Sequence, residues 1–65
     1  MNKISALKAF RANEGLSQRA MADSIGVSLS MYEKVERGYI KASRNFMDSF
    51  KEKYPSIDIE RIFFN

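Results

Sequence analysis

The stretch that decides the fold is residues 16–38, LSQRAMADSIGVSLSMYEKVERG. Two segments with apolar residues at helical spacing lie on either side of residues 26–28, which leaves a turn of about three residues between them. Gly26 supplies the left-handed backbone that such a turn requires, and Ala22 is small enough for two helices to approach closely. The stretch therefore predicts two short helices that cross at a steep angle, a helix-turn-helix unit at about residues 17–37.

Glycine residues punctuate the first two-thirds of the chain. Gly15, Gly26 and Gly38 each follow a segment whose apolar residues recur at three and four, which is typical of a helix that ends at a left-handed glycine. Polar side chains also stand where they can cap the first N–H groups of these helices. The candidate caps are Asn2, Ser17 and Ser28. The apolar residues of the three helices are Ile4, Leu7, Ala9 and Phe10, then Ala20 or Met21 with Ala22 and Ile25, then Met31, Tyr32 and Val35.

The last third of the chain carries two further helical segments. One starts after Ser43 and is stopped by Pro55, and a last short turn is capped by Asp58. No segment alternates as a strand would. We therefore expect an all-α protein, a compact bundle of about five short helices in one domain at 1–65, with the C-terminal helices at 43–64. The apolar residues at helical spacing are Phe46, Met47, Phe50 and Tyr54, then Ile59, Ile62 and Phe63.

The size and composition of the chain exclude most enzyme mechanisms. It has 65 residues with no Cys and no His. A domain of this size buries only about 60% of its unfolded surface, so we expect a compact core and marginal stability. The length leaves no room for a second domain. The missing residue types remove thiolate nucleophiles, the commonest general base and the commonest zinc ligands. We expect no enzymatic activity, no catalytic residue, no cofactor and no metal, and the carboxylates of the last third occupy what look like solvated helix faces.

Charge is distributed unevenly along the chain, whose net charge is +3. Residues 1–45 hold eight basic and four acidic residues, a net of +4, whereas residues 46–65 hold three and four, a net of −1. This asymmetry favours a basic working surface on the first two-thirds and so an anionic partner. An ordinary solvated exterior explains the charges equally well. No apolar run approaches the length of a membrane span or of a signal peptide, so we expect a cytoplasmic protein without a membrane partner.

Residues 16–38 resemble the lambda-repressor and Cro class of helix-turn-helix regulators, also called the XRE class. The class typically shows Leu-Ser/Thr-Gln, an Ala four residues after the Gln, a Gly four further on, and an ending of the form apolar-Glu-x-Gly. The matching residues here are Leu16-Ser17-Gln18, Ala22, Gly26 and Val35-Glu36-Arg37-Gly38. The likeness is good over about residues 4–38 and holds only in outline over 42–64. Residues 51–64 are similar to the ends of small regulators from mobile elements of bacteria, which implies a phage or a mobile element as the source.

Two features depart from the class. The loop at residues 39–43 lacks the proline that often follows the third helix, and Tyr32 stands where a smaller Ile or Val is more frequent. We expect the ring of Tyr32 to pack inward with its hydroxyl group at the surface.

The resemblance implies that the third helix lies in the major groove of double-stranded DNA. By correspondence with the class, the expected base contacts are Leu29, Ser30 and Lys34. Glu33 projects from the same side of the helix and is the fourth expected base contact. The expected phosphate contacts are Gln18, Arg19, Ser28, Arg37, Lys41 and Arg44.

Several of these residues have a second interpretation. Leu29 can instead lean on the edge of the core, and the basic side chains can simply be solvated. Glu33 either accepts from a cytosine amino group or disfavours wrong sequences. Glu36 is expected to pair with Arg11 or Arg19, and Arg19 serves either that pair or a phosphate.

The last third carries more apolar residues than five short helices can comfortably hide. The surplus predicts the surface of a homodimer, for which the candidates are Ile57, Ile59, Ile62, Phe63 and Phe64. A purely intramolecular core is the alternative. We expect a sequence-specific transcriptional regulator, a repressor that acts by occupying its promoter or operator. The other interpretation is an antitoxin or a protein-interaction module that binds a toxin or another protein through its apolar end.

Overall fold

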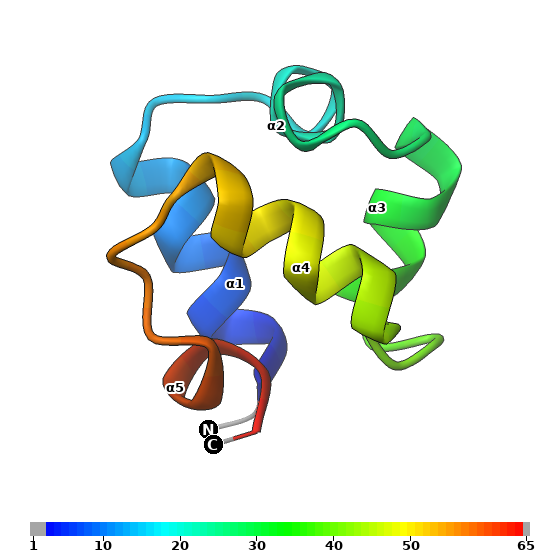
Figure 1. Cartoon of the computed structure of the whole chain (residues 1–65). Helices are drawn as coiled ribbons and strands as arrows, with labels where there is room; N and C mark the ends of the chain where they lie inside the picture. The colour runs from blue at the N-terminus through cyan, green and yellow to red at the C-terminus, as the bar shows by residue number, and fades with distance from the viewer. Residues whose placement is uncertain (1–2, 65) are drawn as a thin grey trace.

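Five helices and no strand make up the part of the chain that the structure describes, as the sequence predicts (Figure 1). The structure is a computed structural model that describes residues 3–64, with side chains from residue 6 onward. The helices are α1 (Lys3–Asn13), α2 (Gln18–Ile25), α3 (Leu29–Glu36), α4 (Arg44–Lys53) and α5 (Ile59–Phe63).

The side-chain caps expected from the sequence form at four of the five helices. Each cap accepts a hydrogen bond from the backbone N–H three residues further on, at 3.0 to 3.2 Å, and so satisfies one of the free donors at the start of its helix. The cap expected at Asn2 and the side chain of Ile4 lie outside the described residues. The four caps are Ser17, Ser28, Ser43 and Asp58.

Left-handed glycines end the first three helical segments, as predicted. Gly26 has φ +79°, and its N–H donates to the carbonyl oxygens at the end of α2. Gly15 and Gly38 have φ +71° and +81°. A left-handed residue at Gly26 lets the chain turn sharply between α2 and α3, with Ser28 already starting the next helix.

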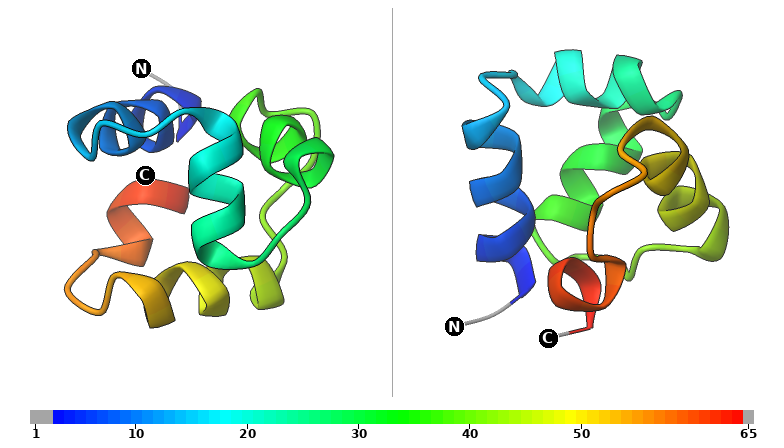
Figure 2. Two further views of the ribbon diagram at one scale, coloured as in Figure 1. Left: turned by 90° about the horizontal axis from the view of Figure 1, so that it is seen from above. Right: turned by 60° about the vertical axis from the view of Figure 1, so that its left-hand side comes forward.

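The first and the last helix pack against each other. α5 lies against α1, and α1 also packs against α3, while α2 packs against α3 and α4 (Figure 2). The α2–α3 pair is thus packed against α1 through α3 and against α4 through α2.

Aromatic rings from four helices form the centre of the core. Phe46 of α4 stacks on Tyr32 of α3 with ring centroids 6.1 Å apart and meets Phe63 of α5 edge-on at 6.0 Å. Phe50 continues this cluster to Phe10 of α1 at 5.5 Å. Such pairs add to the apolar burial that stabilises a small core. The buried apolar residues are Leu7, Met21, Ala22, Ile25, Tyr32, Val35, Phe46, Phe50, Ile57, Ile62 and Phe63.

The structure corrects two expectations about the core and decides one. Ala9 and Met31 were expected inside, but both are exposed. The buried side of α3 is formed by Tyr32, Val35 and Glu36, and Met31 lies about 100° around the helix from Tyr32. In α2 it is Met21 that is buried, while Ala20 is only half-buried.

Candidate nucleic-acid interface

The third helix presents a narrow polar face to solvent. Ser30 and Lys34 are exposed on it, and Arg37 continues the same face directly after the helix. Two of the four expected base contacts, Leu29 and Glu33, are half-buried at the flank of this face. The structure therefore brings Ser30 and Lys34 fully to the surface and leaves Leu29 and Glu33 with partial access.

Serine hydroxyl groups at the starts of α2 and α3 fix the backbone of both helices. Ser28 Oγ accepts from the N–H of Met31 at 3.1 Å, and Ser17 Oγ accepts from the N–H of Ala20 at 3.0 Å. Both serines are exposed, and a hydroxyl that accepts one hydrogen bond still has its own hydrogen to donate. Ser28 can therefore cap α3 and donate to a phosphate oxygen at the same time.

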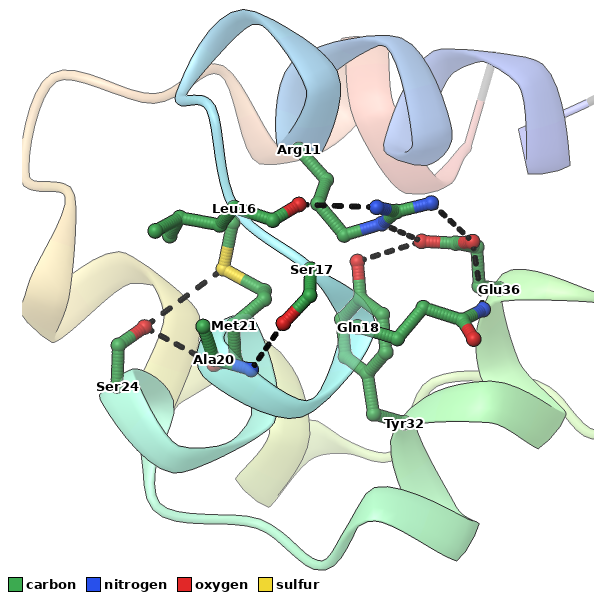
Figure 3. Close-up of polar contacts among 9 residues, drawn as sticks. All are labelled: Arg11, Leu16, Ser17, Gln18, Ala20, Met21, Ser24, Tyr32 and Glu36. Atoms are coloured by element: carbon green, nitrogen blue, oxygen red, sulfur yellow. Dashed lines mark hydrogen bonds and ion pairs between the residues drawn. The ribbon is translucent and has the colours of Figure 1, made fainter.

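A buried carboxylate lies behind this face and receives four hydrogen bonds from three helices (Figure 3). Glu36 accepts from Arg11 Nε at 2.8 Å and Nη2 at 3.1 Å, and from Gln18 Nε2 at 2.9 Å. The fourth donor is the hydroxyl group of Tyr32 at 2.7 Å. Arg11 also donates through Nη1 to the carbonyl oxygen of Leu16 at 2.9 Å, in the link between α1 and α2. The network fixes α3 against α1 and α2.

The network decides between the two partners expected for Glu36. Arg11 is the partner, and its ion pair with Glu36 is the only one among residues whose side chains the structure describes. Arg19 is exposed and takes no part in the network, so its expected alternative role as the partner of Glu36 is wrong.

Burial and hydrogen bonding oppose each other at Glu36. Burial raises the pKa of its carboxyl group, but the hydrogen bonds from Arg11, Tyr32 and Gln18 outweigh burial and hold the pKa below its ordinary value. The hydrogen bond to Glu36 raises the pKa of Arg11 in turn, against the opposing effect of desolvation. The pair is therefore fully charged near neutral pH.

Tyr32 departs from the expected position of its hydroxyl group. The ring packs inward as predicted, but the whole side chain is buried, with 0% exposure, and the hydroxyl group lies inside the protein on Glu36 rather than at the surface. Burial, together with the hydrogen bond to a carboxylate, raises the pKa of Tyr32 far above its ordinary value. Tyr32 can replace a smaller apolar residue here because its hydroxyl group is the fourth donor to the Glu36 carboxylate.

The expected phosphate contacts are mostly on the surface. Gln18 is the exception, because it is half-buried and its amide nitrogen donates to Glu36. That nitrogen carries a second hydrogen, which can be donated to another acceptor. The exposed ones are Arg19, Ser28, Arg37, Lys41 and Arg44. Three of these basic residues lie between the end of α3 and the first residue of α4, so positive charge flanks the C-terminal end of α3.

The residues expected to form a dimer surface are mostly in the core. Ile57, Ile62 and Phe63 are buried within the chain, which corrects that expectation for them, because α5 folds back on α1 and covers the aromatic cluster. Ile59 is half-buried, and Phe64 is 60% exposed.

Two exposed apolar residues were not singled out by the sequence reasoning. Tyr39 is 72% exposed, and Ile40 beside it is also exposed, in the loop that follows α3. The signal available in the sequence was their place after Gly38, where no helical repeat continues and no partner at helical spacing covers them.

Two steeply joined helices, backed by a buried ion pair and faced by exposed polar and basic side chains, define a helix-turn-helix DNA-binding regulator. The sequence matches the model of the helix-turn-helix family over residues 7–47, and the chain belongs to this family, in its lambda-repressor and Cro (XRE) class. No curated protein and no solved structure matches the chain significantly. The family is one of DNA-binding regulators rather than of enzymes. Within residues 3–64, no helix is long and apolar enough to cross a membrane.

Proposed function

We propose that this protein is a sequence-specific transcriptional repressor that binds double-stranded DNA with α3 in the major groove and acts by occupying its operator. The observation that carries the proposal is the exposed face of α3, with Ser30 and Lys34 outward while the opposite side is anchored by the Glu36 network. A helix held at a fixed angle can present side chains to base edges in a reproducible register. Such binding would take place on cytoplasmic DNA.

The chemistry of the outward residues suits base and phosphate contacts. Lys34 can donate to guanine O6 or N7, and Ser30 can donate to or accept from any base edge. Leu29 and Glu33 reach the groove only with the exposed part of their side chains. The phosphate contacts proposed are Gln18, Arg19, Ser28, Arg37, Lys41 and Arg44.

We further propose that two copies bind a near-palindromic site. A single short recognition helix reads few base pairs, and dimers that bind half-sites one helical turn apart are the usual solution. Exposed apolar side chains at Phe64, and at Tyr39 and Ile40, are available for a contact between copies.

The same exposed residues favour a second candidate function. An antitoxin or a protein-interaction module would use Phe64, Tyr39 and Ile40 to bind a toxin or another protein. Sedimentation of the purified protein at high concentration distinguishes the two candidate functions. A dimer supports the self-associating repressor, whereas a monomer that sediments together with the co-expressed product of a neighbouring gene supports the protein-interaction module.

Selection of bound sequences from random duplex DNA tests the main proposal. We expect the selected sequences to share a motif with two related half-sites, and titration of the best duplex to weaken steeply as salt is raised. For about 4 to 8 phosphates contacted per dimer, the logarithm of the binding constant should fall with a slope of about −4 to −7 against the logarithm of salt concentration. Failure to bind any sequence at low salt would overturn the proposal.

A further inference from the structure

One exposed apolar side chain borders the polar face of α3. Met31 lies in the first turn of the helix, next to Ser30, and 39% of it is exposed. It is one of three methionines in the part of the chain with described side chains. Met21 is fully buried and Met47 packs against the core, so Met31 alone of the three is exposed.

The core does not need Met31. The buried side of α3 is filled by Tyr32, Val35 and Glu36, and Tyr32 is stacked on Phe46. On a helix with 3.6 residues per turn, Met31 lies between the direction of Lys34, which is exposed, and that of Val35, which is buried. Met31 therefore lies at the edge of the proposed DNA-reading face.

The surroundings of Met31 favour DNA over a protein as the group that covers it. Its exposed neighbours on α3 are a hydroxyl group at Ser30 and a cation at Lys34, followed by the cation of Arg37. An apolar protein partner would have to leave these polar groups without hydrogen bonds, which is costly. A DNA groove offers acceptors for the cations and also one apolar group on its base edges, the C5 methyl group of thymine.

Met31 is also better placed for this contact than Leu29. Leu29 is half-buried, whereas 39% of Met31 is exposed. The methionine side chain is unbranched and polarizable, and it adapts to irregular apolar surfaces.

We propose that Met31 is a specificity-determining residue that packs against the C5 methyl group of a pyrimidine, thymine in unmodified DNA, in each half-site. This inference rests on the DNA-binding function proposed above. It assigns to the edge of α3 a preference for a methyl group, beside the hydrogen bonds that Ser30 and Lys34 make.

Uracil substitution tests the inference, because replacing thymine by deoxyuridine removes the C5 methyl group and leaves the base-pairing edge intact. A duplex selected by the wild-type protein is synthesised with each thymine replaced in turn, and binding is measured by fluorescence anisotropy. At one thymine per half-site we expect uracil to weaken wild-type binding about fourfold, the transfer free energy of one methyl group.

The variants then assign the methyl contact to a residue. Met31→Ala should bind the thymine and uracil duplexes equally well, whereas Met31→Leu, which keeps an apolar side chain, should retain the preference for thymine. Leu29→Ala and Lys34→Ala should bind more weakly but keep the same preference. Ser56→Ala, exposed and neutral in the loop between α4 and α5, should match the wild type in both respects. Circular dichroism shows that each variant is folded.

The outcomes separate this inference from the proposed function. Two results overturn the role of Met31 alone. In the first, the protein binds a selected duplex, but at no thymine does the effect of the methyl group depend on Met31. In the second, the methyl effect is lost in Leu29→Ala and kept in Met31→Ala. Absence of binding to every duplex overturns both proposals.

Discussion

The hydroxyl group of Tyr32 donates a 2.7 Å hydrogen bond to Glu36 Oε2, one turn further along the same helix. Glu36 is held at the same time by Arg11 of α1 and Gln18 of α2. The ring of Tyr32 stacks on Phe46 of α4. One side chain thus links the buried side of α3 to the polar network on one side and to the aromatic core on the other, and so limits how far the helix can rotate.

Removal of this hydroxyl group should destabilise the protein without opening the core. Tyr32→Phe keeps the ring on Phe46 but takes one of four donors from a buried carboxylate, and we expect a loss of about 2 kcal/mol, in the range for a hydrogen bond to a charged group. Urea denaturation measures it. Tyr39→Phe, at an exposed tyrosine, is the matched control and should leave the midpoint unchanged. Equal midpoints for both variants would contradict the assigned role.

Loss of the cation should cost more than loss of the hydroxyl group. Arg11→Met leaves the Glu36 carboxylate buried without a counter-charge, and we expect a loss of about 3 kcal/mol in unfolding free energy, at the lower end for a broken buried pair because Arg11 is partly exposed. Lys8→Met removes an exposed cation from the same helix and should change stability by less than about 0.5 kcal/mol. A similar effect of the two substitutions in chemical denaturation would show that the pair is unimportant.

The lowered pKa of Glu36 makes part of the stability dependent on pH. Because the pKa is lower in the folded protein than in the unfolded chain, this carboxylate contributes fully above its ordinary pKa of about 4.3, and the contribution is lost as pH falls through the folded value. We expect the difference in unfolding free energy between the wild type and Glu36→Gln to be largest near neutral pH and to shrink below about pH 4. Glu52→Gln, on the exposed side of α4, serves as the control. A difference that stays constant down to about pH 3 would argue against the charged network.

The turn between α2 and α3 should be sensitive to backbone conformation alone. Gly26 has φ +79°, and a Cβ atom added there would meet no atom within 4 Å. We therefore expect Gly26→Ala to cost about 1 to 2 kcal/mol, the cost of a left-handed conformation for an L residue. Gly15→Ala, with φ +71° and equal space, should cost the same, and Gly26→Asn should cost less. A much larger loss in thermal unfolding at Gly26 alone would indicate strain beyond the backbone term.

Local signals in the sequence predicted the fold well. The left-handed glycines and the serine caps act over three or four residues, so their positions alone placed the helix ends at Gly26 and Ser28. The prediction that Met31 is buried was wrong. Met31 stands four residues before Val35, which is the spacing of a core residue, but this spacing does not tell which of two neighbouring directions on the helix is covered.

Tertiary contacts were the part that the sequence left open. The partner of Glu36 depends on where α1 lies relative to α3, which the sequence alone does not give. Arg11 and Arg19 were therefore equally acceptable partners, and the packing of the helices decides for Arg11. The same limit explains why the prediction of a dimer surface was wrong at Ile62 and Phe63. Their apolar periodicity shows that other residues cover them, but not whether those residues belong to the same chain. α5 folds back on α1 and supplies that partner internally.

The exposed basic residues around the end of α3 should determine how strongly DNA binding depends on salt. Arg37, Lys41 and Arg44 are all exposed, and a cation that neutralises a phosphate releases a condensed counterion. If each neutralises a phosphate, its replacement by Ala should weaken binding to all sequences alike and lower the salt slope by about one. Lys53→Ala removes an equal charge from the exposed end of α4 and should leave the slope unchanged. Anisotropy titrations of the selected duplex at several salt concentrations give the slopes, and equal slopes for all four variants would place the DNA backbone elsewhere on the protein.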